Sequence, residues 1–196
     1  MKKTGEERFI LQSAETDIRL LDFWKWNQSD ILNNSLRGIL AEFIVSKAVN
    51  AINETRVEWD AYDLLTADGI KIEVKSAAYL QSWQQSKNSI IQYNIRPTLS
   101  WEASTNTYAT EIKRTADVYV FCLLNQQDRQ LVNPLDLDQW EFFVIATEQI
   151  NREKGSQKTI GLNGILKMKP IMTGFDGIKD AVKRVLSNGN IKIFKT

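Results

Sequence analysis

The spacing of apolar residues along the chain alternates between a helical and a strand-like period. Helical spacing, with apolar side chains three or four positions apart, is typical of the segments 16–26, 35–49, 146–154 and 176–187. Runs rich in β-branched and aromatic residues predict strands at 57–66, 70–77, 90–96, 118–124 and 140–145. This order predicts an α/β or α+β fold with a central mixed sheet flanked by helices.

The chain carries the marks of one continuous domain spanning residues 1–196. Its three prolines fall between patterned segments, and no repeat or low-complexity linker interrupts the pattern. The first dozen residues are polar and carry no predicted element, and Ser35 is the predicted N-cap of the second helix. The polar start and the lack of a long apolar run predict a cytoplasmic protein that does not enter a membrane.

The two strands 57–66 and 70–77 are separated by Ala67-Asp68-Gly69, which predicts a hairpin closed by a left-handed glycine. If Thr66 pairs with Ile70, paired residue numbers sum to 136, and Asp63 stands opposite Glu73. Strand side chains alternate between faces, so Lys75 shares the face of Glu73, whereas Ile72 and Val74 point toward a core.

Directly opposed carboxylates destabilise a sheet unless a cation lies between them. The chain contains no histidine, which excludes Ser-His-Asp triads, histidine-based zinc sites and histidine-dependent nuclease chemistry. Carboxylate oxygens, without histidine or cysteine ligands beside them, favour Mg²⁺ or Mn²⁺. We therefore expect Asp63 and Glu73 to be metal ligands, with Lys75 orienting or deprotonating water or stabilising the transition state. The alternative is a solvated hairpin face with ordinary charges.

The pattern of Asp63 followed after ten residues by Glu73-Val74-Lys75 resembles the PD-(D/E)xK, or restriction-endonuclease-like, nuclease superfamily over residues 35–125. The resemblance implies an αβββαβ core and a Mg²⁺-dependent deoxyribonuclease of restriction, repair or mobile-element type. It also implies that Glu42, on the helix 35–49, approaches the metal as a further ligand and catalytic residue.

This segment departs from the superfamily pattern in two respects. No proline precedes Asp63, and Asp60 competes with it for the role of the acidic ligand. In the register above Asp60 points to the opposite side of the hairpin, so Asp63 is the preferred residue, although a slip of one position would reverse the faces.

The segment after Lys75 is dense in amides and aromatic residues. Gln81 and Ser82 are predicted to bond phosphate or base edges, and Trp83 to stack on a base. The alternative is a surface turn over the core. Arg37 is a candidate phosphate ligand, as is Arg114, and the alternative for both is an ordinary surface position.

Charge is distributed unevenly along the chain, whose net charge is +1. Residues 1–150 hold 15 Lys/Arg and 21 Asp/Glu, a net of −6, whereas residues 151–196 hold 10 and 3, a net of +7. This basic C-terminal segment favours phosphate contacts with DNA or, equally, a solvated lysine-rich face.

Two alternatives to a nuclease stay open, a catalytically silent nucleic-acid-binding module and a structural phage or mobile-element protein. A homodimer is expected if one site per chain cuts both strands.

Overall fold

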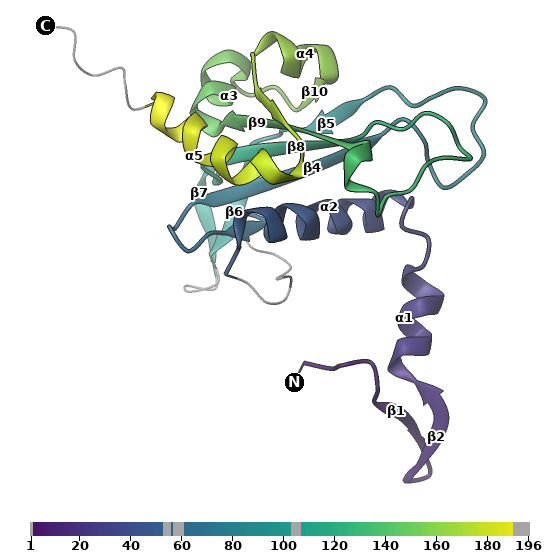
Figure 1. Ribbon diagram of the computed structural model, residues 1–196. Helices are drawn as coiled ribbons and strands as arrows, with labels where there is room; N and C mark the ends of the chain where they lie inside the picture. The colour runs from purple at the N-terminus through teal and green to yellow at the C-terminus, as the bar shows by residue number, and fades with distance from the viewer. Residues whose placement is uncertain (1, 53–55, 57–60, 103–106, 190–196) are drawn as a thin grey trace, which may run out of the picture.

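A five-stranded mixed sheet forms the centre of the protein (Figure 1). The computed structural model describes residues 2–52, 56, 61–102 and 107–189. The strands follow the order β11 (Ile171–Thr173), β9 (Trp140–Ala146), β8 (Val118–Leu124), β4 (Lys71–Ala78) and β3 (Leu64–Leu65). Strands β4 and β8 are parallel, and the other neighbours are antiparallel. The predicted central mixed sheet with flanking helices is confirmed.

Strand β8 occupies the middle of the sheet because all seven of its residues are apolar and buried. Alternate side chains serve two separate cores. Val118, Val120 and Cys122 face one core, and Tyr119, Phe121 and Leu123 face the other. A strand covered on both faces needs such an uninterrupted apolar run. Cys122 is a free, buried thiol.

Helices cover both faces of the sheet. One core lies under α2 (Asn34–Val49) and α5 (Ile178–Gly189). The other lies under α3 (Thr147–Lys154), α4 (Leu162–Lys167) and the ribbon of β5 (Gln92–Asn94) with β10 (Thr159–Gly161). In Figure 1, α2 lies below the sheet, and α3 and α4 lie above it. Short 3₁₀ turns at Leu137–Gln139 and Phe175–Gly177 precede β9 and α5.

No helix in the described part of the chain is both long and apolar enough to cross a membrane.

Helix α2 begins one residue before its predicted start. Asn33 is the N-cap, because its side chain accepts a hydrogen bond from the backbone N–H of Ser35. The prediction of Ser35 as N-cap was therefore wrong. The helix ends at its C-cap, Asn50, which adopts a left-handed conformation (φ 53°). The backbone N–H of Asn50 donates a hydrogen bond to the carbonyl of Ser46.

The register predicted for the hairpin is confirmed over residues 64–66 and 70–72. Leu64 pairs with Ile72 and Leu65 with Lys71, and the N–H of Thr66 donates to the carbonyl of Ile70. Gly69 closes the turn at φ +79°, a conformation that side-chain-bearing residues rarely adopt. The regular part of the first strand is short, and residues 57–60, with Asp60 among them, lie outside the described residues.

The third predicted strand, 90–96, does not join the central sheet. Its described strand, β5, pairs instead with β10. The connection between the parallel strands β4 and β8 passes through β5 and the hairpin of β6 (Thr98–Glu102) with β7 (Thr107–Lys113), which the sequence pattern did not predict. The residues described between β4 and β8 contain no helix. The expected αβββαβ order is therefore not reproduced in this crossover.

The N-terminal residues form an arm that projects from the body (Figure 1). Strand β1 (Arg8–Leu11) pairs with β2 (Ala14–Arg19), and α1 (Leu20–Gln28) follows. The predicted helix 16–26 was wrong at its start. Residues 14–19 extend along β1, and the Asp22 carboxylate accepts from the N–H of Arg19, which starts the helix there. The first dozen residues, predicted to carry no element, supply β1.

Arg114 is a buried structural residue rather than a surface phosphate ligand. Its guanidinium donates to the carbonyls of Ile95, Gly155 and Gln157 and to the side chain of Asn151, at 2.7 to 3.2 Å. These bonds join the crossover to the segment after α3. Burial lowers the pKa of Arg114 from its usual value.

We expect Arg114→Met to lower the free energy of unfolding by about 3 kcal/mol, because it leaves buried carbonyl groups without a donor. Urea denaturation provides the measurement. Arg152→Met is the matched control, since the Arg152 side chain is 57% exposed. Equal stability of the two variants would contradict the structural role of Arg114.

Candidate active site on the β3–β4 hairpin

Asp63 lies directly before β3 and is joined to β4 by one backbone and one side-chain hydrogen bond. Its N–H donates to the carbonyl of Ile72 at 3.1 Å, although Ile72 is the partner of Leu64, so the regular pairing ends at Leu64 and Asp63 lies at an irregularity of the strand. Its Oδ2 accepts from the N–H of Val74 at 2.7 Å, in place of a partner-strand carbonyl. The carboxylate is thereby held against β4 next to Glu73.

Glu73 and Lys75 form an ion pair on the same face of β4. Lys75 Nζ lies 2.5 Å from Glu73 Oε1, and the two side chains are only 28% and 20% exposed. Ile72 and Val74, between and beside them, belong to the core under α2, as the alternation predicted. Because side chains alternate along a strand, the charged residues of β4 lie on one face of the sheet and its apolar residues on the other.

Glu42 projects from α2 and is 14% exposed. Both of its oxygens accept hydrogen bonds from Arg56, from Nε at 2.5 Å and from Nη2 at 3.2 Å. The charge of Glu42 also acts on Asp63 and Lys75. The structure therefore brings Asp63, Glu73 and Lys75 together on β4, whereas Glu42, bound to Arg56, acts on Asp63 and Lys75 through its charge.

Electrostatic conflict is concentrated on Asp63. Burial and the negative charge of Glu73 raise the pKa of Asp63 to about 7, although Lys75 and the N–H of Val74 act in the opposite direction. For Lys75, burial lowers the pKa, but the charges of Glu73 and Asp63 outweigh it, so the pKa is raised above its usual value. The group thus keeps its lysine charged.

Tyr119 is a member of this group that the sequence did not reveal. The parallel register of β4 with β8 places it beside Glu73, and it is 4% exposed. Burial and the charges of Glu73 and Asp63 raise the pKa of its hydroxyl. Only the pairing of β4 with β8 could have identified it, and no local signal predicts which strands become neighbours.

The donor set fits a cation held by one or two carboxylates better than a closed cage. Among the described residues, no group of three or more His, Cys, Asp or Glu side chains converges closely enough to hold a metal ion. Glu73 and Glu42 each have a basic partner, and Asp63 accepts from a backbone N–H. Mg²⁺ commonly uses one or two carboxylates and takes its remaining ligands from water and phosphate. In such a site Asp63 and Glu73 would be the two carboxylates.

Two of the predicted substrate-binding residues are buried together. Arg37 is 4% and Gln81 is 6% exposed, and Arg37 Nη1 donates to Gln81 Oε1 at 3.3 Å. Arg37 also donates to the carbonyl of Leu32 and to the side chain of Asn34. The amide of Gln81 donates to the carbonyl of Ala78 and the hydroxyl of Ser89. As arranged here, both side chains join α2 to the segment after β4 rather than face solvent.

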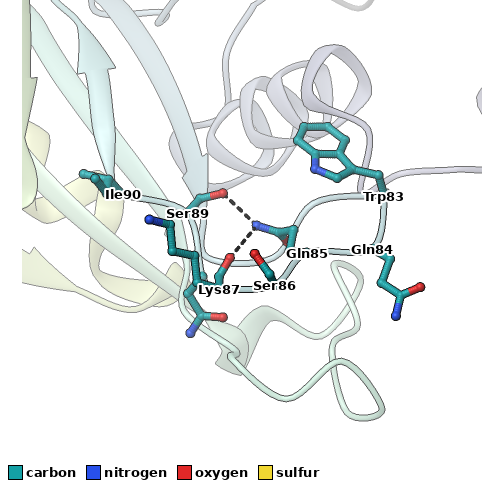
Figure 2. A pocket seen from close by; sticks show the side chains of 8 residues that line it. Trp83, Gln84, Gln85, Ser86, Lys87, Ser89 and Ile90 are labelled. Atoms are coloured by element: carbon teal, nitrogen blue, oxygen red, sulfur yellow. Dashed lines mark hydrogen bonds between the residues drawn. The ribbon is translucent and has the colours of Figure 1, made fainter.

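Trp83, in contrast, is 56% exposed at the rim of an open hollow formed by residues 83–90 (Figure 2). The hollow has a volume of about 530 Å³. Gln85 holds the loop in shape by donating to Ser89 Oγ and to the carbonyl of Lys87, and Arg129 donates to the carbonyls of Gln81 and Trp83. Ser82, next to Trp83, is partly exposed.

The basic C-terminal segment is described up to residue 189, so Lys192 and Lys195 lie outside it. Lys167, Lys169, Lys179 and Arg184 are exposed. Lys183 Nζ lies 3.2 Å from Oδ2 of Asp68, and Asp68 belongs to the turn of the β3–β4 hairpin. The arrangement is compatible with phosphate contacts and with a solvated face alike.

Fold and site together define an α/β protein with a carboxylate and lysine group on the central sheet beside a short edge strand. The chain belongs to the bacteriophage T4 endonuclease IV family, whose sequence profile matches residues 1–164. The match covers Glu42, Asp63, Glu73, Lys75 and Trp83. Family membership supports a nuclease, without specifying the PD-(D/E)xK type. Comparison with curated proteins finds no match.

We expect Asp63→Asn to stabilise the protein in EDTA at pH 8, by on the order of 1–2 kcal/mol, because the ionised carboxylate is buried beside Glu73. A raised carboxyl pKa means that wild-type stability falls as pH rises from the unfolded value near 4 to about 7 and is then constant. The advantage of the variant should therefore grow over that interval. Urea denaturation at pH 5 and pH 8 measures it.

Asp68→Asn is the control for this substitution, because Asp68 lies in the turn of the same hairpin with 64% of its side chain exposed. An Asp63→Asn variant that behaves like this control at both pH values would show that Asp63 is not electrostatically strained.

Proposed function

We propose that this chain is a Mg²⁺-dependent endonuclease that hydrolyses DNA phosphodiester bonds, with Asp63, Glu73 and Lys75 as a PD-(D/E)xK-type site. The observation that carries the proposal is the hydrogen bond that holds the Asp63 carboxylate at the N–H of Val74, between Glu73 and its ion-pair partner Lys75 on β4. Two carboxylates forced together inside a sheet, at a cost to folding, are typical of functional sites. Family membership supports the nuclease class.

Each residue has a distinct part in the proposed reaction. Asp63 and Glu73 would hold Mg²⁺, which supplies charge neutralisation at the phosphate and a more acidic water. In hydrolysis the water oxygen bonds to phosphorus, the ester bond to the leaving oxygen breaks, and that oxygen takes up a proton. Lys75, charged through its ion pair with Glu73, stabilises the negative charge that develops on the phosphoryl oxygens.

Glu42 is proposed as a supporting residue of the same site. Its oxygens bind Arg56, so its negative charge is held at the edge of the group rather than at its centre. From there it favours a cation near Asp63 without adding a third carboxylate at contact distance.

The nucleolytic prediction is tested by Glu73→Gln and Lys75→Met, which should each reduce Mg²⁺-dependent cleavage of DNA by at least about 100-fold. Supercoiled and linear DNA serve as substrates, with Mn²⁺ in a parallel series and EDTA as the metal-free arm. Chelation should abolish cleavage by the wild-type protein.

Glu111 and Lys113 provide a matched control within the same chain. They form a second Glu-x-Lys triplet on strand β7, with an ion pair at 3.4 Å, but their side chains are 73% and 54% exposed. Glu111→Gln and Lys113→Met should leave cleavage unchanged. Full activity of Glu73→Gln and Lys75→Met would refute the assignment of the site.

A second candidate function is a binding module without turnover. It is favoured by the fact that each acid of the group already has a hydrogen-bonding or ionic partner. Such a module would bind DNA with a salt-dependent affinity that EDTA does not change and would show no cleavage with either metal.

Trp83 is proposed as a stacking platform for a nucleobase, because its indole is exposed on a loop that Gln85 and Arg129 hold rigidly. Trp83→Ala should weaken DNA binding by about 5- to 100-fold, and Trp83→Phe should retain most of the affinity. Fluorescence anisotropy with a labelled oligonucleotide, in the Glu73→Gln background with EDTA, measures binding without cleavage.

Ile90→Ala is the control for stacking, since Ile90 lines the same hollow and is 90% exposed but has no ring. Equal losses for Trp83→Ala and Ile90→Ala would mean that the hollow contributes apolar area and no stacking.

A further inference from the structure

Helix α2 is apolar on two sides, although the sheet covers only one of them. Ala41, Ile44, Val45 and Val49 pack into the core. On the opposite side Leu36, Ile39 and Phe43 follow at helical spacing, and Ile39 is 39% and Phe43 55% exposed. Lys47 lies on the same side, with its Nζ 5.2 Å from the centre of the Phe43 ring. The outer face of α2, defined by Leu36, Ile39 and Phe43, therefore lacks a cover within the described chain.

The N-terminal arm, residues 4–28, is the second uncovered apolar surface. Its hydrogen bonds to the backbone run within the arm, from Leu20 to Glu7 and from Leu21 to Gly5. Helix α1 has no buried residue. Six large apolar side chains of the arm are between 44% and 82% exposed, namely Phe9, Ile10, Leu11, Ile18, Phe23 and Trp26.

The exposed apolar area of the arm, summed over all its sides, is comparable with the area that a standard protein interface buries. A large apolar side chain contributes roughly 150–250 Å² of surface, so the exposed parts of these six amount to on the order of 700 Å². A standard interface buries about 800 Å² on each partner. Because Ile10 alternates with Phe9 and Leu11 along β1, this area is spread over more than one side of the arm.

The segment that joins arm and body holds the arm away from its own α2. Leu32 packs against the core, its carbonyl accepts from Arg37 Nη1, and the N–H of Asn33 donates to the carbonyl of Asp30. The anchored connection directs α1 away from the sheet, as Figure 1 shows. The outer face of α2 and the arm of one chain therefore do not meet each other.

We propose that the arm docks on the outer face of α2 in a second copy of this chain, and that the second copy returns the contact. The two surfaces are both apolar, belong to one sequence and are separated by an anchored connection, and a reciprocal exchange of arms between two copies closes with two-fold symmetry. The product is a dimer with two identical arm-to-α2 contacts. This proposal does not depend on nuclease activity.

The first test is the mass of the full chain in solution, by sedimentation equilibrium over a range of concentrations. The wild-type protein should be a dimer at micromolar concentration. A wild-type monomer at about 50 µM would overturn the proposal and would indicate a different partner for the arm.

Two variants then assign the surfaces. Ile10→Asp combined with Leu11→Asp places a charge on both faces of β1, because strand side chains alternate. Phe43→Asp places a charge on the outer face of α2, where Lys47, which lies over the Phe43 ring, can pair with it and preserve the helix. Both proteins should remain folded by circular dichroism, and both should dissociate at least 100-fold more readily than wild type.

Ile90→Asp is the control, since Ile90 is 90% exposed and lies on neither surface. It should leave the dimer intact. If only the arm variant dissociates, the arms contact each other. If only Phe43→Asp dissociates, the α2 helices contact each other. Either result overturns the arm-to-α2 pairing.

A mixing experiment tests the exchange itself. In a mixed dimer of the arm variant and Phe43→Asp, one contact carries both defects and the other consists of an unchanged arm on an unchanged α2. The mixed dimer should therefore form more tightly than either variant alone, as measured with one protein fluorescently labelled. A mixed dimer no tighter than the two homodimers would refute reciprocal exchange.

Discussion

The antiparallel register between β3 and β4 is the constraint on which the candidate site depends. It is fixed by the turn at Ala67–Gly69 and by the burial of Leu64 and Ile72 on one side of the sheet. Once these apolar residues are inside, the residues that alternate with them must face the other way. Glu73 and Lys75 thus share one face of β4 as a consequence of core packing, and the side chain of Asp63 joins them by accepting a hydrogen bond from the N–H of Val74.

This arrangement carries an electrostatic cost that the rest of the fold tolerates. Burial and repulsion raise the pKa of Asp63, whereas Lys75 compensates part of the charge from the same strand. Strand β8 contributes Tyr119 beside Glu73 and, on its other face, the apolar residues under α2. The tight packing of β8 on both faces supports the neighbouring β3–β4 hairpin, where the like charges of Asp63 and Glu73 lie. The proposed nuclease chemistry uses this strain, because a cation relieves it.

A different physical problem governs the N-terminal region. The arm cannot bury its apolar side chains within its own few elements, and the outer side of α2 has no partner from the described chain. Both surfaces lie on elements next to the body's anchored connection at 29–33, so one association can cover both. Helix α2 contributes to both the candidate site and the proposed dimer contact. Its Glu42 belongs to the candidate site, and its Phe43 belongs to the proposed dimer contact.

The sequence by itself determined the elements whose partners are local. The run 118–124 was a strand because it is apolar throughout, and the hairpin register followed from a glycine turn and strict alternation. The grouping of Asp63, Glu73 and Lys75 was predictable for the same reason, since ten residues of hairpin connect them. The helix 35–49 needed only a correction of its cap, because Asn33 and Ser35 both offer suitable oxygens.

The tertiary structure decided whatever depends on distant partners. Strand β5 left the central sheet for β10, and Tyr119 reached Glu73, through pairings between segments far apart in sequence. Arg37 and Arg114 are buried against acceptors far away in sequence, Gln81 for Arg37 and the carbonyls of Ile95 and Gly155 for Arg114, which no local pattern reveals. Residues 8–19 became a hairpin instead of a helix and an unstructured start because each strand stabilises the other. Local periodicity specifies which face of an element is apolar, but only the assembled fold specifies what covers it.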